Sequence, residues 1–245
     1  MQLLWSDSNG FSSTAAAVLV RTLSDKPALN VALPTGRTPV GLYADICAQA
    51  REGRLPLDRA RWFNLDEYLG LAPDHPYSYA RFLREHLLDR IDAAPDRVRL
   101  LRGDAADPQA ECRDYDRAIA AAGGLDLAIL GLGANGHIAF NEPGSDWAGT
   151  THIVTLSDQT WEANAAGLGG APGSPPDLPR RGLTMGVATL RAARRVLLLV
   201  SGESKRQAFA ALQRGLPDRQ WPVTSLLDHP DLVVVVDECL KSPNR

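Results

Sequence analysis

Cysteine and lysine are scarce in this chain of 245 residues. The three cysteines, Cys47, Cys112 and Cys239, lie far apart and form neither a CxxC pair nor a cluster with histidines. This spacing gives little support to a zinc site, a disulfide framework or a cysteine nucleophile. Lysine accounts for Lys26, Lys205 and Lys241 among 26 basic residues, which makes the position of each lysine informative.

Long apolar runs and a strong net charge are also absent. No stretch approaches the roughly 20 apolar residues of a membrane-spanning helix, and the N-terminus, Met1–Asp7, has no signal-peptide pattern. A formal net charge of −3 gives no indication of nucleic acid or an anionic membrane as a partner. The composition, with 44% hydrophobic and 22% charged residues, is typical of a globular protein, and we expect a cytoplasmic location.

Apolar, β-branched runs alternate with helical patterns along the chain, without an internal repeat. This alternation predicts an α/β fold: a single Rossmann-like domain over residues 1–245, whose mostly parallel sheet has helices on both faces. The predicted strands are Asn30–Leu33, Arg61–Leu65, Arg97–Leu101, Leu125–Leu130, His152–Leu156, Val196–Val200 and Leu232–Val236. The predicted helices are Gly10–Leu23, Pro39–Arg51, Ser78–Arg90, Pro108–Ala121, Ser157–Ala166 and Ser204–Gln213.

One segment interrupts the alternation. Gly167–Gly182 contains five glycines and four prolines and is predicted to be an irregular loop. A loop of this length is unusual in a compact domain and is typical of either a linker or an active-site lid. A two-domain split at this point is disfavoured, because the later strands continue the same alternation.

The most specific segment of the chain is Leu130–Gly144, which reads LGLGANGHIAFNEPG. It follows a predicted strand and places His137 and Glu142 five positions apart between glycines. A histidine with a nearby carboxylate has its tautomer fixed and its basicity raised, as a proton-transfer site requires. The alternative is a glycine-rich turn with a structural histidine, which the GxG pair alone favours.

Two strand-to-helix junctions carry candidate anion-binding groups. Thr35–Pro39 joins a buried strand to a helix, with Thr38 as the predicted cap and proline in the first turn. The free N–H groups and positive dipole end of such a helix suit phosphate, although the spacing equally supports a capped helix without a ligand. Lys205 begins a second unit of this kind, for which a solvated helix lysine is the alternative.

Asp66 and Glu67 follow the strand predicted to end at Leu65. Adjacent residues in an extended segment point in opposite directions, so these two carboxylates should not share a role. A raised pKa caused by burial would suit Asp66 as a base. From the sequence alone, a surface Asp–Glu turn is the favoured interpretation.

These motifs together resemble the glucosamine-6-phosphate deaminase family. Leu130–Gly144 is nearly identical to the family segment G-x-G-x-[DN]-G-H-I-[AG]-F-N-E-P, and three more stretches match in the same order. They are Leu33–Pro39, Phe63–Tyr68 and Leu183–Val187. The resemblance spans about residues 10–238, which is nearly the whole chain. Related 6-phosphogluconolactonases share the Gly-His core but usually lack the Asn-Glu-Pro that follows it.

The resemblance implies a role for each candidate residue. Asp66 is the base that moves a proton between C2 and C1 of the opened sugar, and His137 opens the ring. Glu142 holds His137 in the required tautomer and stabilises its charged form, and Asn135 orients it without carrying negative charge. The implied phosphate-binding residues are Thr35, Gly36, Arg37, Thr38 and Lys205. The implied reaction needs no metal and no cofactor, and the resemblance places a lid at about residues 157–182.

The chain also departs from the family. Ala166 stands where the family has a lid arginine that binds the sugar phosphate, and Arg180 or Arg181 is the candidate replacement. Asp146–His152 lacks the arginines that some hexameric members use for effector binding. The sequence therefore predicts a glucosamine-6-phosphate deaminase, acting on a small sugar phosphate as a monomer or a homo-oligomer. A galactosamine-6-phosphate deaminase, a 6-phosphogluconolactonase-type hydrolase and a non-catalytic sugar-phosphate sensor are the alternatives.

Overall fold

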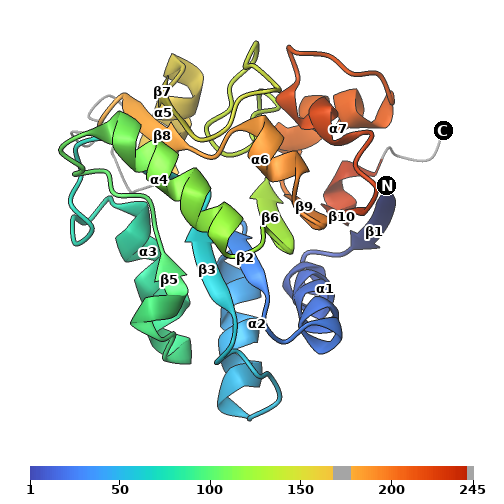
Figure 1. Ribbon diagram of the computed structural model, residues 1–245. Helices are drawn as coiled ribbons and strands as arrows, with labels where there is room; N and C mark the ends of the chain where they lie inside the picture. The colour runs from blue at the N-terminus through green and yellow to red at the C-terminus, as the bar shows by residue number, and fades with distance from the viewer. Residues whose placement is uncertain (168–177, 242–245) are drawn as a thin grey trace.

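The computed structural model describes residues 1–167 and 178–241. Its centre is a seven-stranded sheet in the order β1-β10-β9-β6-β2-β3-β5, in which every neighbouring pair is parallel (Figure 1). The strands are β1 (Gln2–Ser6), β2 (Asn30–Leu33), β3 (Arg61–Asn64), β5 (Val98–Arg99), β6 (Leu127–Gly131), β9 (Arg195–Val200) and β10 (Leu232–Asp237). The predicted α/β fold with a mostly parallel sheet is confirmed.

Helices cover both faces of this sheet, as predicted. They are α1 (Phe11–Asp25), α2 (Val40–Arg51), α3 (Tyr79–His86), α4 (Pro108–Ala121), α5 (Asp158–Gly167), α6 (Val187–Arg191) and α7 (Arg206–Gln213). The short 3-10 helices are η1 (Leu88–Ile91), η2 (Pro95–Arg97), η3 (Glu203–Lys205), η4 (Pro222–Leu226) and η5 (Glu238–Leu240). Helices α1, α2 and α3 pack on one face, and α4, α6 and α7 pack on the other (Figure 1).

The continuous apolar strands explain this arrangement. Along β2, Val31 and Leu33 enter the core beneath α1 and α2, whereas Ala32 enters the core on the opposite face. Strands β6, β9 and β10 divide their side chains between the two cores in the same alternating way. Because both faces of each central strand are buried, the strand needs apolar residues at every position.

A second, antiparallel sheet stands beside the first, in the order β4-β8-β7. Its strands are β4 (Asp66–Tyr68), β7 (His152–Thr155) and β8 (Arg181–Thr184). The prediction that Asp66 and Glu67 form a surface turn is wrong, because both are buried in β4. The pairing that makes β4 a strand comes from β8, which lies more than a hundred residues further along the chain.

The strand order places the carboxyl ends of β2 and β6 next to each other at a switch point. From β2 the chain continues through β3 and β5 towards one edge of the sheet, and then returns to β6, β9 and β10 on the other side. The loops that follow β2 and β6 therefore run in opposite directions and leave a crevice between them, where α/β proteins commonly bind ligands. Both glycine-containing motifs predicted to bind the substrate lie there.

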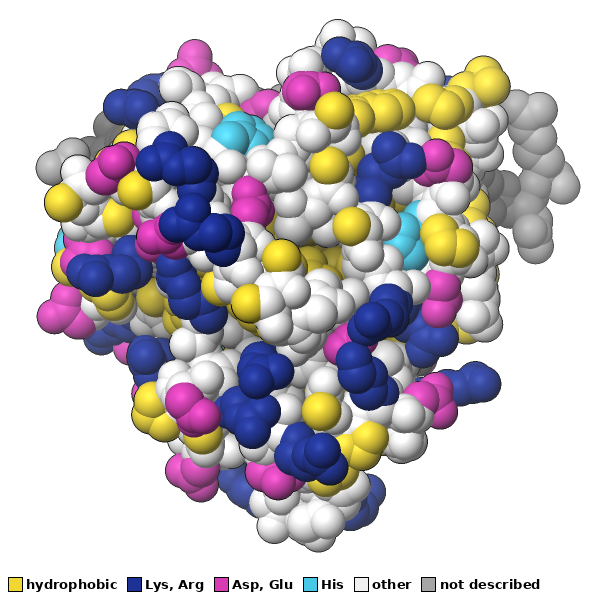
Figure 2. Space-filling view, in the orientation of Figure 1, with side chains coloured by type: hydrophobic (Ala, Val, Ile, Leu, Met, Phe, Trp, Pro, Cys, Tyr) yellow, Lys and Arg dark blue, Asp and Glu magenta, His cyan; other side chains and the backbone are white. Residues whose placement is uncertain are grey.

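The predicted lid at residues 157–182 begins with α5 and ends with the first residues of β8. Residues 168–177 of this segment lie outside the described residues, so the lid stays a prediction. Figure 2 shows basic and acidic side chains interspersed on the visible face, with hydrophobic side chains in small groups between them. Within residues 1–167 and 178–241, no helix combines the length and apolar character needed to cross a membrane.

Candidate active site

A cavity of about 770 Å³ opens at the carboxyl ends of the parallel strands. Its walls come from the loops after β2, β6 and β9, from the start of β4 and from α5. A cavity of this size suits a small-molecule ligand. The structure brings eight of the nine predicted site residues to this cavity: Thr35, Gly36, Arg37, Thr38, Asp66, Asn135, His137 and Lys205. The ninth, Glu142, lies behind the lining.

Asp66, the first residue of β4, presents its carboxylate to the cavity. The residue is only 5% exposed, and its carboxylate has no hydrogen-bond partner among the described residues. Burial raises the pKa of the Asp66 carboxyl well above its usual range, and the neighbouring charge of Glu67 raises it further. A buried carboxylate with a raised pKa is a stronger base than an exposed one, and the cavity is where it can take a proton.

Glu67 points the opposite way, as the alternation of an extended segment requires. Its carboxylate accepts hydrogen bonds from the backbone N–H groups of Tyr68, Tyr79 and Ala80 and from the Ser78 hydroxyl. Burial raises the pKa of Glu67, and these hydrogen bonds oppose the rise. Glu67 thus anchors the start of α3 and does not line the cavity.

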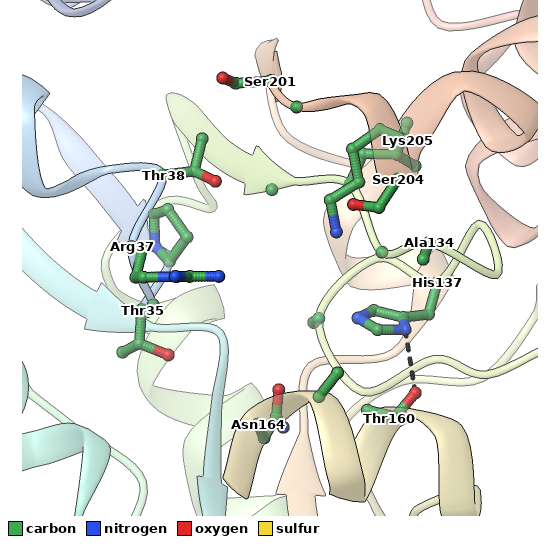
Figure 3. Close-up of a pocket in the computed structure, with 18 of the residues that line it drawn as sticks. Thr35, Arg37, Thr38, Ala134, His137, Thr160, Asn164, Ser201, Ser204 and Lys205 are labelled. Atoms are coloured by element: carbon green, nitrogen blue, oxygen red, sulfur yellow. Dashed lines mark hydrogen bonds between the residues drawn. The ribbon is translucent and has the colours of Figure 1, made fainter. Parts of the chain in front are cut away.

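His137 is held by its Nδ1 atom. This atom lies 2.7 Å from Asn135 Oδ1 and 3.1 Å from Thr160 Oγ1, and the other ring nitrogen is directed towards the cavity (Figure 3). Because an amide oxygen can only accept, Nδ1 carries the proton and Nε2 keeps its lone pair. The ring packs so closely on Gly133 that a Cβ there would lie 2.3 Å from it.

The charged form of His137 is disfavoured by its surroundings. The ring is partly exposed to the cavity but enclosed by protein, and this desolvation lowers the pKa of His137 to about 4. The negative charge of Glu142 opposes this shift, and the positive charge of Lys205 adds to it. His137 is therefore a neutral imidazole at neutral pH, able to accept a proton at Nε2.

Glu142 reaches His137 through Asn135 rather than by a direct hydrogen bond. Its Oε2 accepts from Asn135 Nδ2 at 2.8 Å, and its Oε1 accepts from the Ser157 N–H at 3.2 Å and from the Ser157 Oγ at 3.1 Å. The carboxylate thus fixes the orientation of the Asn135 amide, which in turn presents its oxygen to His137. We call Asn135, His137, Glu142, Ser157 and Thr160 the histidine wall.

Thr35, Gly36, Arg37 and Thr38 line the side of the cavity opposite His137, and Lys205 lies on the same side as His137 (Figure 3). We call these five residues the cation wall. Gly36 has φ +89°, a conformation that favours glycine, and a side chain there would meet no atom within 4 Å. The prediction that Thr38 caps the helix is wrong: Pro39 occupies the cap position of α2, and no side chain makes a cap hydrogen bond. The Thr38 hydroxyl consequently remains available at the cavity.

Arg37 and Lys205 extend their charged groups into the cavity from opposite sides (Figure 3). In the part of the chain that the structure describes, neither forms a salt bridge. Burial, and then the charge of Arg37, lowers the pKa of Lys205. Two facing cations without a carboxylate partner suit a ligand with more than one negative charge.

The arginines proposed to replace the missing lid arginine do not lie in the cavity lining. Arg180 stacks on Trp161, with its guanidinium carbon 4.4 Å from the ring centroid, and pairs with Asp158. Arg181 is exposed at the start of β8. Ala166 itself lines the cavity, so the position corresponding to the lid arginine faces the ligand space.

The lining residues that were missed from the sequence include Tyr79, Thr160 and Asn164. The Tyr79 hydroxyl lies 3.3 Å from that of Tyr68, whose hydroxyl accepts from Asn164 Nδ2 at 2.9 Å. The only sequence signal for Thr160 is the pattern Ser157-x-x-Thr160 at a helix start, which indicates a cap but not a partner. Among the described residues, no group of three or more potential ligands is arranged to hold a metal ion.

Known proteins are similar to this chain over nearly its whole length. Residues 8–234 match the family of glucosamine-6-phosphate isomerases and 6-phosphogluconolactonases. A glucosamine-6-phosphate deaminase of Porphyromonas gingivalis is 42% identical over 215 residues, covering 88% of this chain and 80% of that protein. One of Rhodopirellula baltica is 41% identical over 236 residues, covering 96% of this chain and 92% of that protein.

Solved structures of related proteins are similar to this chain as well. A monomeric glucosamine-6-phosphate deaminase superposes with a TM-score of 0.93 at 36% identity, covering 98% of this chain and all of the other. A 6-phosphogluconolactonase from Thermotoga maritima has a TM-score of 0.75 at 22% identity, covering 96% and 99%, which shows a shared fold alone. The chain belongs to the family of glucosamine-6-phosphate isomerases and 6-phosphogluconolactonases.

Proposed function

We propose that this protein is a glucosamine-6-phosphate deaminase, which converts glucosamine 6-phosphate to fructose 6-phosphate and ammonia. The observation that carries the proposal is the combination of groups in one cavity. They are the buried Asp66 carboxylate, which has no hydrogen-bond partner in residues 1–167 and 178–241, the neutral His137 and the two facing cations Arg37 and Lys205. The relatives named as glucosamine-6-phosphate deaminases support it, since they match 80% or more of their own length.

The cation wall binds the 6-phosphate in this proposal. The phosphate group lies between Arg37 and Lys205, and the hydroxyls of Thr35 and Thr38 donate to its oxygens. Charge-assisted hydrogen bonds of this kind are the strongest polar contacts available to a sugar phosphate. The bound negative charge also offsets the positive charge of Lys205, which favours protonation of His137 when the substrate is present.

Ring opening is assigned to His137. Nε2 takes the proton of the O1 hydroxyl and delivers it to the ring oxygen as the C1–O5 bond breaks, which leaves an open-chain aldehyde. While the ring is protonated, Nδ1–H continues to donate to Asn135, and the carboxylate of Glu142 lies one residue further along the same chain of hydrogen bonds. Asn135 and Glu142 thus stabilise the transient positive charge of His137 from the side of the ring remote from the sugar.

Proton transfer between carbon atoms is assigned to Asp66. The carboxylate removes the C2 proton, and one proton of the C2 ammonium group moves to the C1 oxygen, which gives an enolamine. Asp66 then returns its proton to C1, and C2 becomes a protonated ketimine carbon. Water adds at C2 and ammonia leaves, so that C2 becomes the carbonyl of fructose 6-phosphate. Every step moves protons or water, and none requires an oxidant, a reductant or a Lewis acid.

Ammonia release from a substrate panel tests the proposal. We expect ammonia from glucosamine 6-phosphate, much less from free glucosamine, and the same rate after exhaustive EDTA treatment. Ammonia released faster from galactosamine 6-phosphate would reassign the epimer. Acid production from 6-phosphogluconolactone without ammonia from any amino sugar would indicate a lactonase. Tight binding of glucosamine 6-phosphate without turnover would indicate a sensor.

A further inference from the structure

The hydroxyl of Thr160 is used differently from that of an ordinary helix threonine. Threonines inside helices commonly donate to the carbonyl four residues earlier, as Thr22 of α1 does to the Val18 carbonyl at 2.8 Å. Thr160 lies in the first turn of α5, where the residue four positions earlier precedes the helix, so its hydroxyl is available for another contact. Its Oγ1 lies instead 3.1 Å from His137 Nδ1 (Figure 3). Thr160 is only 2% exposed, so its contact with the histidine lies inside the protein.

Ser157 leaves Thr160 free to do this. Ser157 directly precedes α5, and its hydroxyl oxygen accepts the Thr160 N–H at 3.2 Å, which is the hydrogen bond of a helix cap. The same hydroxyl donates to Glu142 Oε1 at 3.1 Å. The cap of α5 is therefore formed by Ser157, and the Thr160 hydroxyl, which lies 3.2 Å from the Ser157 Oγ, is not needed for it.

Helix α5 holds Thr160 in a fixed place. Its start is tied to Glu142 by Ser157, and one turn after Thr160 the Asn164 amide donates to the Tyr68 hydroxyl at 2.9 Å. The first two turns of α5 are thus attached to other elements at their start and at their end. A group fixed in this way can orient a neighbouring side chain more strictly than one on a free loop.

We propose that Thr160 is a positioning residue for His137: its hydroxyl and Asn135 Oδ1 together hold the ring with Nδ1 protonated and Nε2 directed at the substrate. The proposal rests on the proposed function, because it assigns Nε2 as the atom that moves the proton during ring opening. Asn135 alone supplies one acceptor, about which the ring can tilt. The second acceptor, 3.1 Å away on a different element, restricts that movement.

Thr160→Val tests this, because valine keeps the branched shape and removes the hydroxyl. We expect kcat with glucosamine 6-phosphate to fall about three- to tenfold, the effect of one hydrogen bond, with KM changed less than twofold. Thr160→Ser should restore kcat to within about twofold of the wild-type value. Thr22→Val is the matched control, since it makes the same change at a buried helix threonine remote from the cavity, and should leave kcat unchanged.

Nitrogen-15 NMR of the His137 ring gives a readout that does not depend on turnover. The wild-type ring should show the Nδ1-protonated tautomer, and Thr160→Val should raise the fraction protonated at Nε2. Thr160→Ala provides a second variant without the hydroxyl if the valine variant does not fold. Unchanged ring shifts in the hydroxyl-free variants, or a Thr160→Ser variant no better than Thr160→Val, would overturn the proposal. Normal ring shifts in a protein that releases no ammonia would instead count against the proposed function.

Discussion

The histidine wall and the cation wall differ in whether their polar side chains have partners within the protein. In the histidine wall the polar side chains are bonded to one another: Asn135 connects Glu142 to His137, and Ser157 connects Glu142 to Thr160. In the cation wall, Arg37 and Lys205 have no ionic partner among the described residues, and the Thr38 hydroxyl is not used as a cap. The hydrogen bonds of the histidine wall are formed without a ligand, whereas the positive charges of the cation wall are left for a ligand to neutralise.

This difference teaches which kinetic parameter each region should control. A network that is complete before binding contributes preorganisation, which affects the rate of the chemical step. Unpaired cations contribute binding energy that exists only when an anion is present, and they should act mainly through KM. Asp66, at the start of β4, also lines the cavity and is assigned to the chemical step. Substitutions can therefore test separately the residues that affect the chemical step and those that affect substrate binding.

Asp66→Asn should have the largest effect. Asparagine keeps the shape of the side chain but cannot accept a proton, and loss of a general base costs about two to four orders of magnitude in rate. We expect kcat to fall by that amount with KM nearly unchanged. The measurement is ammonia release at saturating glucosamine 6-phosphate. A variant that retained more than about a tenth of the wild-type kcat would remove Asp66 from the role of base.

The same variant should be more stable than the wild type at neutral pH. The folded-state pKa of Asp66 is raised, so its contribution to stability is complete below the unfolded-state pKa and is lost as pH rises through the folded-state pKa. Asparagine carries no such penalty. We expect Tm to rise by about 2–4 °C at neutral pH, equivalent to about 1 kcal/mol in a chain of this size. The difference should vanish in acid, and a Tm gain independent of pH would contradict this explanation.

The next largest effect is expected from the cation wall. Lys205→Ala removes a charge-assisted contact to phosphate, worth about 1.5–3 kcal/mol, so KM for glucosamine 6-phosphate should rise about ten- to hundredfold. Arg37→Ala should act in the same direction, and kcat should change much less in both. Steady-state kinetics with phosphorylated and free glucosamine separate the cases. An equal loss on both substrates would show that these cations do not bind the phosphate.

The parallel sheet could be predicted from the sequence because its information is local. Runs such as Val31–Leu33 and Leu232–Val236 are apolar at every position, and the junctions that follow strands carry their own glycine and capping signals. The predicted helix at Pro108–Ala121 matches α4 at both ends. Each of these predictions depends on residues that are neighbours in the chain.

The missed parts depend on distant partners. Strand β4 contains two acids, and it is a strand because it pairs with β8 and because α3 donates hydrogen bonds to Glu67. Strand β1 is recognisable only beside β10, its partner at the edge of the sheet. The contact of Thr160 with His137 joins residues 23 positions apart, and no local spacing encodes it. The residue types of the site were therefore predictable, but their connections were not.

Ala166→Arg should have a smaller effect, in the favourable direction. Ala166 lines the cavity, and Arg180 is occupied by Trp161 and Asp158 outside it, so the described lining offers no substitute for a cation at this position. We expect KM for glucosamine 6-phosphate to fall about three- to tenfold, less than a full charge-assisted contact because α5 was not built around the longer side chain. Ala166→Gln is the matched control for length without charge. If both variants lower KM equally, charge is not the cause.

The smallest effect is expected for Glu142→Gln, which removes a charge from the histidine wall and keeps an acceptor for the Asn135 amide. The carboxylate of Glu142 raises the pKa of His137 against the desolvation that lowers it to about 4. Its loss should lower that pKa further, and kcat should fall less than about tenfold, because the hydrogen-bonded geometry survives. NMR titration of the His137 ring measures the shift directly.

Inorganic phosphate should move the pKa of His137 upward in both the wild type and Glu142→Gln, since an anion between Arg37 and Lys205 offsets the positive charge that disfavours the imidazolium. An unchanged pKa in Glu142→Gln would confine Glu142 to a structural role, whereas an upward shift with phosphate would still show that the cation wall acts on the histidine across the cavity.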